Sequence, residues 1–168
     1  MRNALCCLLL AGAAQQGFAA CVADGPVQTA RWIYSSQRTF TVYESPQDAA
    51  LMQRFLSPLL LRLMQVEWRC QVIEEGLCAL DTDPWTNSGD ATLPAPVSFT
   101  AEMAAATRAN IRMRFHPGRS VEPRRSVAAQ ATLRLSKDEV SGCWRLDDII
   151  GAKGRSLLQQ LREYRFYP

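Results

Sequence analysis

The sequence predicts an α+β domain in which N-terminal helices precede a four-stranded antiparallel sheet and a short C-terminal helix. Two observations support this fold class. Between residues 27 and 75, apolar residues recur with a helical period. From residue 97 onward, apolar and polar residues alternate, as in strands that have one packed face and one solvated face. A chain of 168 residues, 48% of them hydrophobic, is expected to form one domain.

The first 19 residues have the pattern of a secretory signal peptide, which leaves residues 20–168 as a single domain. Arg2 precedes an apolar stretch, and Gly17-Phe18-Ala19 supplies small residues before a cleavage point. We therefore expect a periplasmic or secreted bacterial protein. The alternative is a lipoprotein anchored through Cys21, because Phe18-Ala19-Ala20-Cys21 is similar to a lipobox. No later segment is apolar enough to span a membrane.

Four cysteines follow the signal, and an even number in an oxidising compartment predicts two disulfides. They are Cys21, Cys70, Cys78 and Cys143. Three connectivities are open. We favour Cys70–Cys78, because the chain turns back between these residues, and then Cys21–Cys143 by elimination. Lipidation of Cys21 would leave one thiol unpaired.

Three helices are predicted before the sheet, over residues 27–39, 46–56 and 58–75. Ser45-Pro46 and Ser57-Pro58 each combine a capping side chain with a proline suited to the first helical position. Gly76 is expected to take the left-handed conformation after the third helix. The buried stripe of that helix is expected to contain Leu59, Leu63, Val66, Cys70 and Ile73, widened by Leu60, Met64 and Trp68.

Four strands are predicted, over residues 97–103, 108–115, 127–135 and 144–150, and a short helix follows from Ser156. In the last strand, strict alternation places Trp144, Leu146 and Asp148 on one face, and Trp144 is expected to be the core position most sensitive to mutation.

The loop over residues 81–90 is rich in turn residues and is expected to be pinned by a buried Trp85. The alternative for this loop is a calcium site made by Asp81, Asp83, Asn87 and Asp90. Their spacing is not that of an EF-hand.

Three motifs together resemble an uncharacterised family of bacterial exported proteins and lipoproteins. They are the Asp83-Pro84-Trp85 loop with Asp90, the strand Trp144-Arg145-Leu146-Asp147-Asp148-Ile149, and Gly154-Arg155-Ser156-Leu157-Leu158. The resemblance covers roughly residues 27–165. It implies a cystatin-like or nuclear-transport-factor-2-like fold, in which a curved sheet forms a cone, and a location in the cell envelope. The family has no agreed activity, so the resemblance implies no catalytic residue.

Arginines concentrate in the second half of the chain, although the formal net charge is only +3. Between residues 108 and 134 the only acid is Glu122, and the candidate binding residues are Arg108, Arg112, Arg114, Arg119, Arg124, Arg125 and Arg134. Arginine suits carboxylate and phosphate groups, so an acidic protein or an anionic envelope component is the expected partner. Nucleic acid is not expected, because no aromatic stacking platform accompanies the arginines. The alternative is an outer sheet face that is merely solvated.

The residues that usually carry catalysis are scarce, and the sequence assigns no catalytic residue, metal or cofactor. His116 is the only histidine. The leading hypothesis is a non-catalytic binding module of the periplasm, in a sharper form an immunity protein that blocks a toxin delivered there. The alternative is a small-molecule enzyme in which Asp148, joined by Tyr34, acts as an acid or base in a pocket inside the cone.

Overall fold

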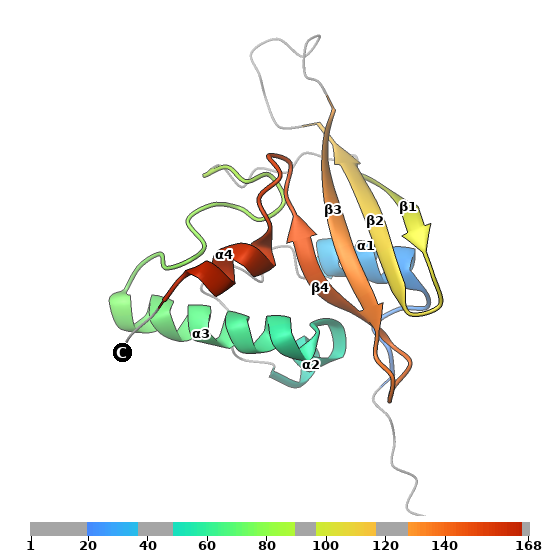
Figure 1. Cartoon of the computed structure of the whole chain (residues 1–168), viewed down its shortest axis with the longest axis horizontal. Helices are drawn as coiled ribbons and strands as arrows, with labels where there is room; N and C mark the ends of the chain where they lie inside the picture. Colours follow the sequence, from blue (N-terminus) through green and yellow to red (C-terminus); the bar gives the residue numbers. More distant parts are fainter. Residues whose placement is uncertain (1–19, 37–48, 90–96, 117–127, 166–168) are drawn as a thin grey trace, which may run out of the picture.

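The computed structural model describes residues 20–36, 49–89, 97–116 and 128–165. These ranges contain α1 (Pro26–Ser36), α2 (Ala49–Phe55), α3 (Pro58–Glu74), β1 (Ser98–Ala104), β2 (Arg108–Phe115), β3 (Ala129–Lys137), β4 (Trp144–Ile150) and α4 (Leu157–Glu163). The predicted α+β class and order of elements are confirmed (Figure 1). The predicted signal peptide and the Ser45-Pro46 helix start lie outside the described residues.

One face of the sheet forms the main core. The strands run antiparallel in the order β1-β2-β3-β4. Ile111 and Met113 of β2 and Leu133 of β3 are fully buried on this face, where α1 covers the sheet with its buried Ile33 (Figure 1). The outer strands β1 and β4 do not pair with each other, so the sheet stays open, whereas the resemblance implies a curved sheet that forms a cone.

Both outer strands contain a β-bulge. On β1 the register shifts between Ala101 and Met103, which makes Glu102 the extra residue. On β4 the extra residue is Asp147, because Leu146 and Asp148 lie opposite consecutive residues of β3. A bulge leaves one residue unpaired and reverses the alternation of side chains beyond it.

The bulge on β4 overturns one prediction about the faces of the sheet. Leu146 lies opposite Leu135 on the core face, as expected, and Trp144 packs partly buried against the same core. Asp148 instead lies opposite Arg134, which belongs to the other face. The expectation that Asp148 shares the face of Trp144 and Leu146 is therefore wrong.

The remaining helices lie beyond the edge of β4 (Figure 1). The chain between α2 and α3 pairs with this edge, since Leu56 forms a parallel bridge with Leu146 and the Ser57 N–H donates to the Leu146 carbonyl oxygen at 2.9 Å. Ser57 also caps α3, because its Oγ accepts from the Leu60 N–H at 3.4 Å. The predicted start of α3 is thus confirmed, and it is fixed directly to the sheet.

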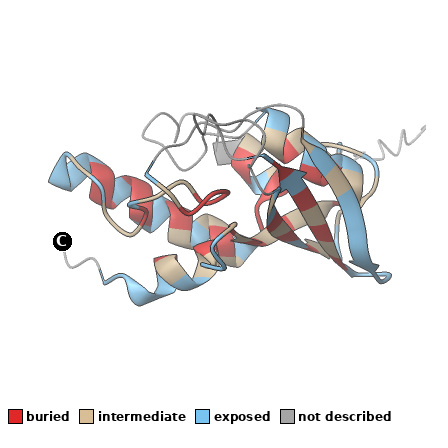
Figure 2. Ribbon diagram, turned by 90° about the horizontal axis from the view of Figure 1, so that it is seen from above, coloured by how far each residue is buried: buried red, intermediate tan, exposed pale blue. Residues whose placement is uncertain are grey.

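The buried face of α3 is rotated from the predicted one. Leu60, Met64 and Trp68 are buried, whereas Val66 and Ile73 are 45% and 53% exposed (Figure 2). The left-handed residue at the end of the helix is Glu75, with φ 50°, rather than Gly76.

The buried side of α3 includes a carboxylate, and this explains the rotation. Glu67 is 1% exposed and accepts hydrogen bonds from the N–H groups of Ala79 and Leu80 at 2.9 and 3.2 Å. The Gln71 Nε2 donates to it at 2.8 Å. A buried carboxylate is tolerated when donors of this kind satisfy its oxygens. Glu67 therefore holds the chain that returns along α3, and the helix turns this side inward.

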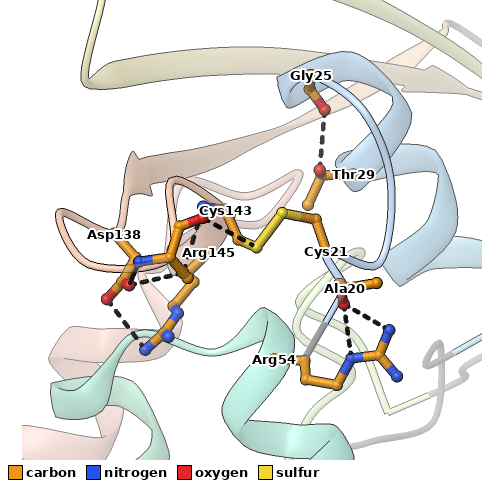
Figure 3. Close-up of a disulfide and its surroundings, with 9 residues drawn as sticks. Ala20, Cys21, Gly25, Thr29, Arg54, Asp138, Cys143 and Arg145 are labelled. Carbon is orange, nitrogen blue, oxygen red and sulfur yellow. Dashed lines mark hydrogen bonds and ion pairs between the residues drawn. A yellow bond between two sulfur atoms is a disulfide. The ribbon is translucent and has the colours of Figure 1, made fainter. Parts of the chain in front are cut away.

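The structure contains both disulfides with the expected pairing. Cys70 and Cys78 are joined across the end of α3, with their Cα atoms 6.2 Å apart. Cys21–Cys143 joins the start of the described chain to the residue that precedes β4, with a Cα separation of 5.2 Å (Figure 3). Beside it, the Arg54 guanidinium donates to the Ala20 carbonyl oxygen at 2.7 and 3.1 Å. Ala20 and Cys21, which follow the predicted cleavage point, are thus held by hydrogen bonds and by a disulfide.

The two disulfides indicate the cellular compartment in which the protein folds. Two disulfides in one small domain indicate an oxidising, extracytoplasmic compartment. A Cys21 sulfur that is bonded to Cys143 cannot also carry a lipid, so the lipoprotein alternative is incompatible with this structure. None of the helices in the described ranges combines the length and the apolarity that a membrane crossing requires.

Internal hydrogen bonds and a buried Trp85 hold the described part of the loop after α3, residues 81–89, as its turn residues predict. Asp83 Oδ1 accepts from the N–H groups of Trp85 and Thr86 at 3.0 and 2.8 Å. Trp85 is fully buried, and its carbonyl oxygen accepts from the Ala152 N–H at 2.9 Å. Asn87 Oδ1 accepts from two N–H groups of the segment after β4. The side-chain oxygens of Asp83 and Asn87 are thus engaged in hydrogen bonds within the fold, and Asp90, the last residue of the calcium alternative, lies outside the described residues.

We expect Trp85→Ala to be more destabilising than Trp144→Ala, contrary to the expectation from the sequence. Truncating a fully buried aromatic costs about 3–5 kcal/mol. Trp144 keeps part of its side chain in water, so its truncation should cost less. Urea unfolding of the two variants checks the order. Equal losses, or a larger loss for Trp144→Ala, would contradict it.

Asp138, in the turn between β3 and β4, should make stability depend on pH. Ser141 donates to Asp138 Oδ1 from its hydroxyl at 2.6 Å and from its N–H at 2.8 Å, and Arg145 lies 3.3 Å from Oδ2. The Ser141 hydroxyl is the main cause that lowers the pKa of Asp138 below its ordinary value of 3.8; burial acts in the opposite direction. A lowered pKa means that the carboxylate stabilises the fold above the unfolded pKa, and that this contribution is lost as the pH falls through the folded pKa.

Asp138→Asn is therefore expected to lower the free energy of unfolding by about 1 kcal/mol at pH 7. The difference from wild type should shrink as the pH falls below 3.8. Thermal unfolding of both proteins between about pH 2.5 and pH 7 measures this difference, because aspartates titrate within roughly this range. Ser141→Ala removes the main donor and should weaken the same pH dependence. If the difference in stability between wild type and Asp138→Asn stays constant with pH, the Asp138 carboxylate does not cause the pH dependence.

Candidate functional site

The face of the sheet opposite the core carries four of the predicted arginines. Arg108, Arg112 and Arg114 alternate with the buried residues of β2, and Arg134 of β3 lies opposite Asn110 of the same row. These four arginines therefore share one outer face of the sheet. We call this surface the basic face. Arg119, Arg124 and Arg125 lie outside the described residues.

The four arginines differ in how they are paired. Arg112 forms an ion pair with Glu102, the bulged residue of β1. Arg134 lies 3.6 Å from Asp148, and 57% of its side chain is exposed. Arg108 and Arg114 are exposed and have no acidic partner within the described part of the chain. Two guanidinium groups of the basic face are thus available to a ligand.

An open groove of about 720 Å³ crosses the sheet at one end of the basic face. Its floor is a row of paired residues, one from each strand, formed by Met103, Asn110, Arg134 and Asp148. The two bulges lie at the level of this row. The groove is further lined by Arg108, Ser136 and Asp147 of the sheet, by Ser57, Pro58, Leu59 and Arg62 at the start of α3, and by Leu158 of α4.

The carboxylate of Asp148 is engaged inside the protein. Asp148 is 3% exposed, and its oxygens accept from the Ser156 hydroxyl at 2.8 and 3.0 Å and from the Leu158 N–H at 2.9 Å. Ser156 in turn caps α4 by accepting from the Gln159 N–H. This arrangement anchors the first turn of α4 to the sheet and to Arg134. Both oxygens of the Asp148 carboxylate thus accept hydrogen bonds from the start of α4.

Tyr34 is not beside Asp148. It lies on α1, where its ring contacts Trp85 and Phe99 at centroid distances of 5.5 and 5.7 Å. Phe99 lies opposite Met113 on the core face, whereas Asp148 is on the other face. The structure therefore does not bring the two residues of the expected pocket together.

Several groove residues were not recognised from the sequence. Arg62 is exposed on α3, and the docking of α3 on β4 brings it to the groove. Met103 and Asp147 enter the groove because of the bulges. The adjacent acids at 147 and 148, which interrupt the polar–apolar alternation, are the one signal in the sequence that could have indicated the second bulge.

The groove offers guanidinium, amide and hydroxyl groups, which suit recognition of carboxylates or other anions. His116 lies exposed just after β2. Among the residues that the structure describes, no three His, Cys, Asp or Glu side chains are grouped so that they could hold a metal ion.

Comparisons of this chain with protein-family models, with curated proteins and with solved structures found no match. The resemblance to a family of exported proteins therefore stays a prediction. The inferences about function below rest on this chain's own residues and their geometry.

Proposed function

We propose that this protein is a non-catalytic binding module of the bacterial envelope that holds an acidic partner protein against its basic face. The observation that supports the proposal most directly is the exposure of Arg108 and Arg114, on one face of one strand, without acidic partners in the described residues.

The fold gains nothing from these two side chains. Arg108 and Arg114 lie at opposite ends of β2, about 20 Å apart along the strand, and neither has an acidic neighbour in the described residues. A carboxylate from a partner would form charge-assisted hydrogen bonds with either guanidinium group, each worth about 1.5–3 kcal/mol. Exposed arginines also accelerate encounter with an acidic surface. Binding that is sensitive to salt follows from this proposal.

A finer form of the proposal is an immunity protein that blocks a toxin delivered to the periplasm. The two disulfides and the charged face are compatible with that role. We also propose that the fold belongs to the cystatin-like class. The succession of helices and four antiparallel strands supports this assignment, although the open sheet departs from a cone. No contact in the described residues favours the alternative of a small-molecule enzyme.

The double variant Arg108→Glu/Arg114→Glu is expected to lose the partner. Both side chains are exposed and unpaired in the described structure, so the fold should tolerate the change. Wild type, immobilised with its disulfides intact, should capture an acidic protein from envelope extract, and about 0.5 M salt should release it, since such salt shortens electrostatic range to a few ångströms. The double variant should bind at least about tenfold more weakly.

The matched control is Arg31→Glu/Arg69→Glu, which makes the same change of charge at exposed positions of α1 and α3. This control should capture as much partner as wild type does. If both double variants lose the partner equally, only net charge matters and the proposed face is wrong. If the Arg108→Glu/Arg114→Glu variant retains its partner, the proposal fails.

A further inference from the structure

The groove at the end of the basic face differs from the rest of that face, because it combines unpaired arginines with apolar ends. We infer that it is the subsite for an extended peptide segment of the partner, with an acidic side chain at its centre and apolar side chains on both sides. This inference rests on the proposed function, and it names the chemistry that the groove would recognise.

The dimensions of the groove suit a short extended segment. Its floor is the row Met103–Asn110–Arg134–Asp148, which crosses all four strands. Neighbouring strands lie about 4.8 Å apart, so the row is about 14 Å long. An extended chain rises about 3.3 Å per residue, and about four residues therefore cover the row.

The charges in the groove favour an acid at the centre of the segment. Arg62 and Arg108 are exposed there and have no acidic partner in the described residues. Asp148 is buried and already satisfied by its internal donors, and Asp147 accepts from the Ser136 hydroxyl at 2.9 Å. Three arginines against two aspartates leave one positive charge in excess. An acidic side chain of a segment that lies between Arg108 on β2 and Arg62 on α3 would balance it.

The two ends of the groove favour apolar side chains. At the β1 end, Met103 is 48% exposed although it is a large hydrophobic residue. At the other end, Pro58 and Leu59 of α3 and Leu158 of α4 line the wall. A polyphosphate would have nothing apolar to place against these residues.

The openness of the groove distinguishes a peptide from a small metabolite. Pockets for small molecules bury most of their ligand. Here Arg134, in the middle of the floor, keeps 57% of its side chain exposed. A ligand that lies on this floor is covered on one side only, as an extended segment of a larger protein would be.

The test uses fluorescein-labelled pentapeptides in which the central residue is Glu or Gln and the two end residues are Leu or Ser. Fluorescence anisotropy with the full disulfide-bonded protein measures their affinities. The peptide with Glu at the centre and Leu at both ends should bind at least tenfold more tightly than either the Gln-centred or the Ser-ended peptide. Arg62→Gln and Arg108→Gln should each abolish most of this preference for Glu over Gln.

Arg69→Gln is the matched control, because Arg69 is an exposed arginine of α3, as Arg62 is, and does not line the groove. It should leave pentapeptide affinity unchanged. The inference is overturned if Glu and Gln peptides bind alike, if Arg69→Gln weakens binding as much as Arg62→Gln, or if a sulfated polysaccharide displaces the peptide and binds more tightly. Failure of the pentapeptides, with partner capture still dependent on Arg108 and Arg114, would remove the groove and leave the proposed function. Specific pentapeptide binding without such capture would support the groove as a peptide subsite and would remove the proposed function.

Discussion

The carboxylate of Asp148 is buried where β3, β4 and α4 meet, and it is bonded to the start of α4 while Arg134 approaches it from β3. A carboxylate that was buried without such donors would cost several kcal/mol. The donors are within reach only because the bulge at Asp147 turns Asp148 away from the core. The position of α4 and the floor of the groove therefore both depend on one inserted residue in β4.

The sequence predicts correctly those elements in which local pattern and tertiary environment agree. Strands β2 and β3 are regular and paired on both sides, so each residue lies on the face that strict alternation assigns to it. The arginines of the basic face follow from that regularity. The start of α3 is also local, since Ser57 and Pro58 determine it through a cap and a fixed backbone angle. The disulfide pairing follows from the same kind of local argument at Cys70 and Cys78.

The parts that could not be predicted depend on partners distant in the sequence. Glu67 turns inward because a later segment supplies N–H donors, and no helical period contains this information. The bulges at Glu102 and Asp147 change which side chains face the groove, although each inserts only one residue. Arg62 belongs to the candidate site because Leu56 and Ser57 attach α3 to the edge of β4. The period of the apolar residues thus predicts the fold class, whereas the groove depends on residues that depart from that period.

The Cys21–Cys143 disulfide has a consequence for how the chain matures. Its cysteines are 122 residues apart, with both other disulfide-forming cysteines between them. A chain that enters an oxidising compartment N-terminus first presents Cys21 to Cys70 and Cys78 long before Cys143 arrives. Pairing in order of arrival gives the wrong connectivity, which thiol–disulfide exchange must then correct. Once formed, the bond closes a loop of a length that stabilises a fold by about 5 kcal/mol in chain-entropy terms. Yield in a host would then be limited by disulfide isomerase rather than by disulfide oxidase.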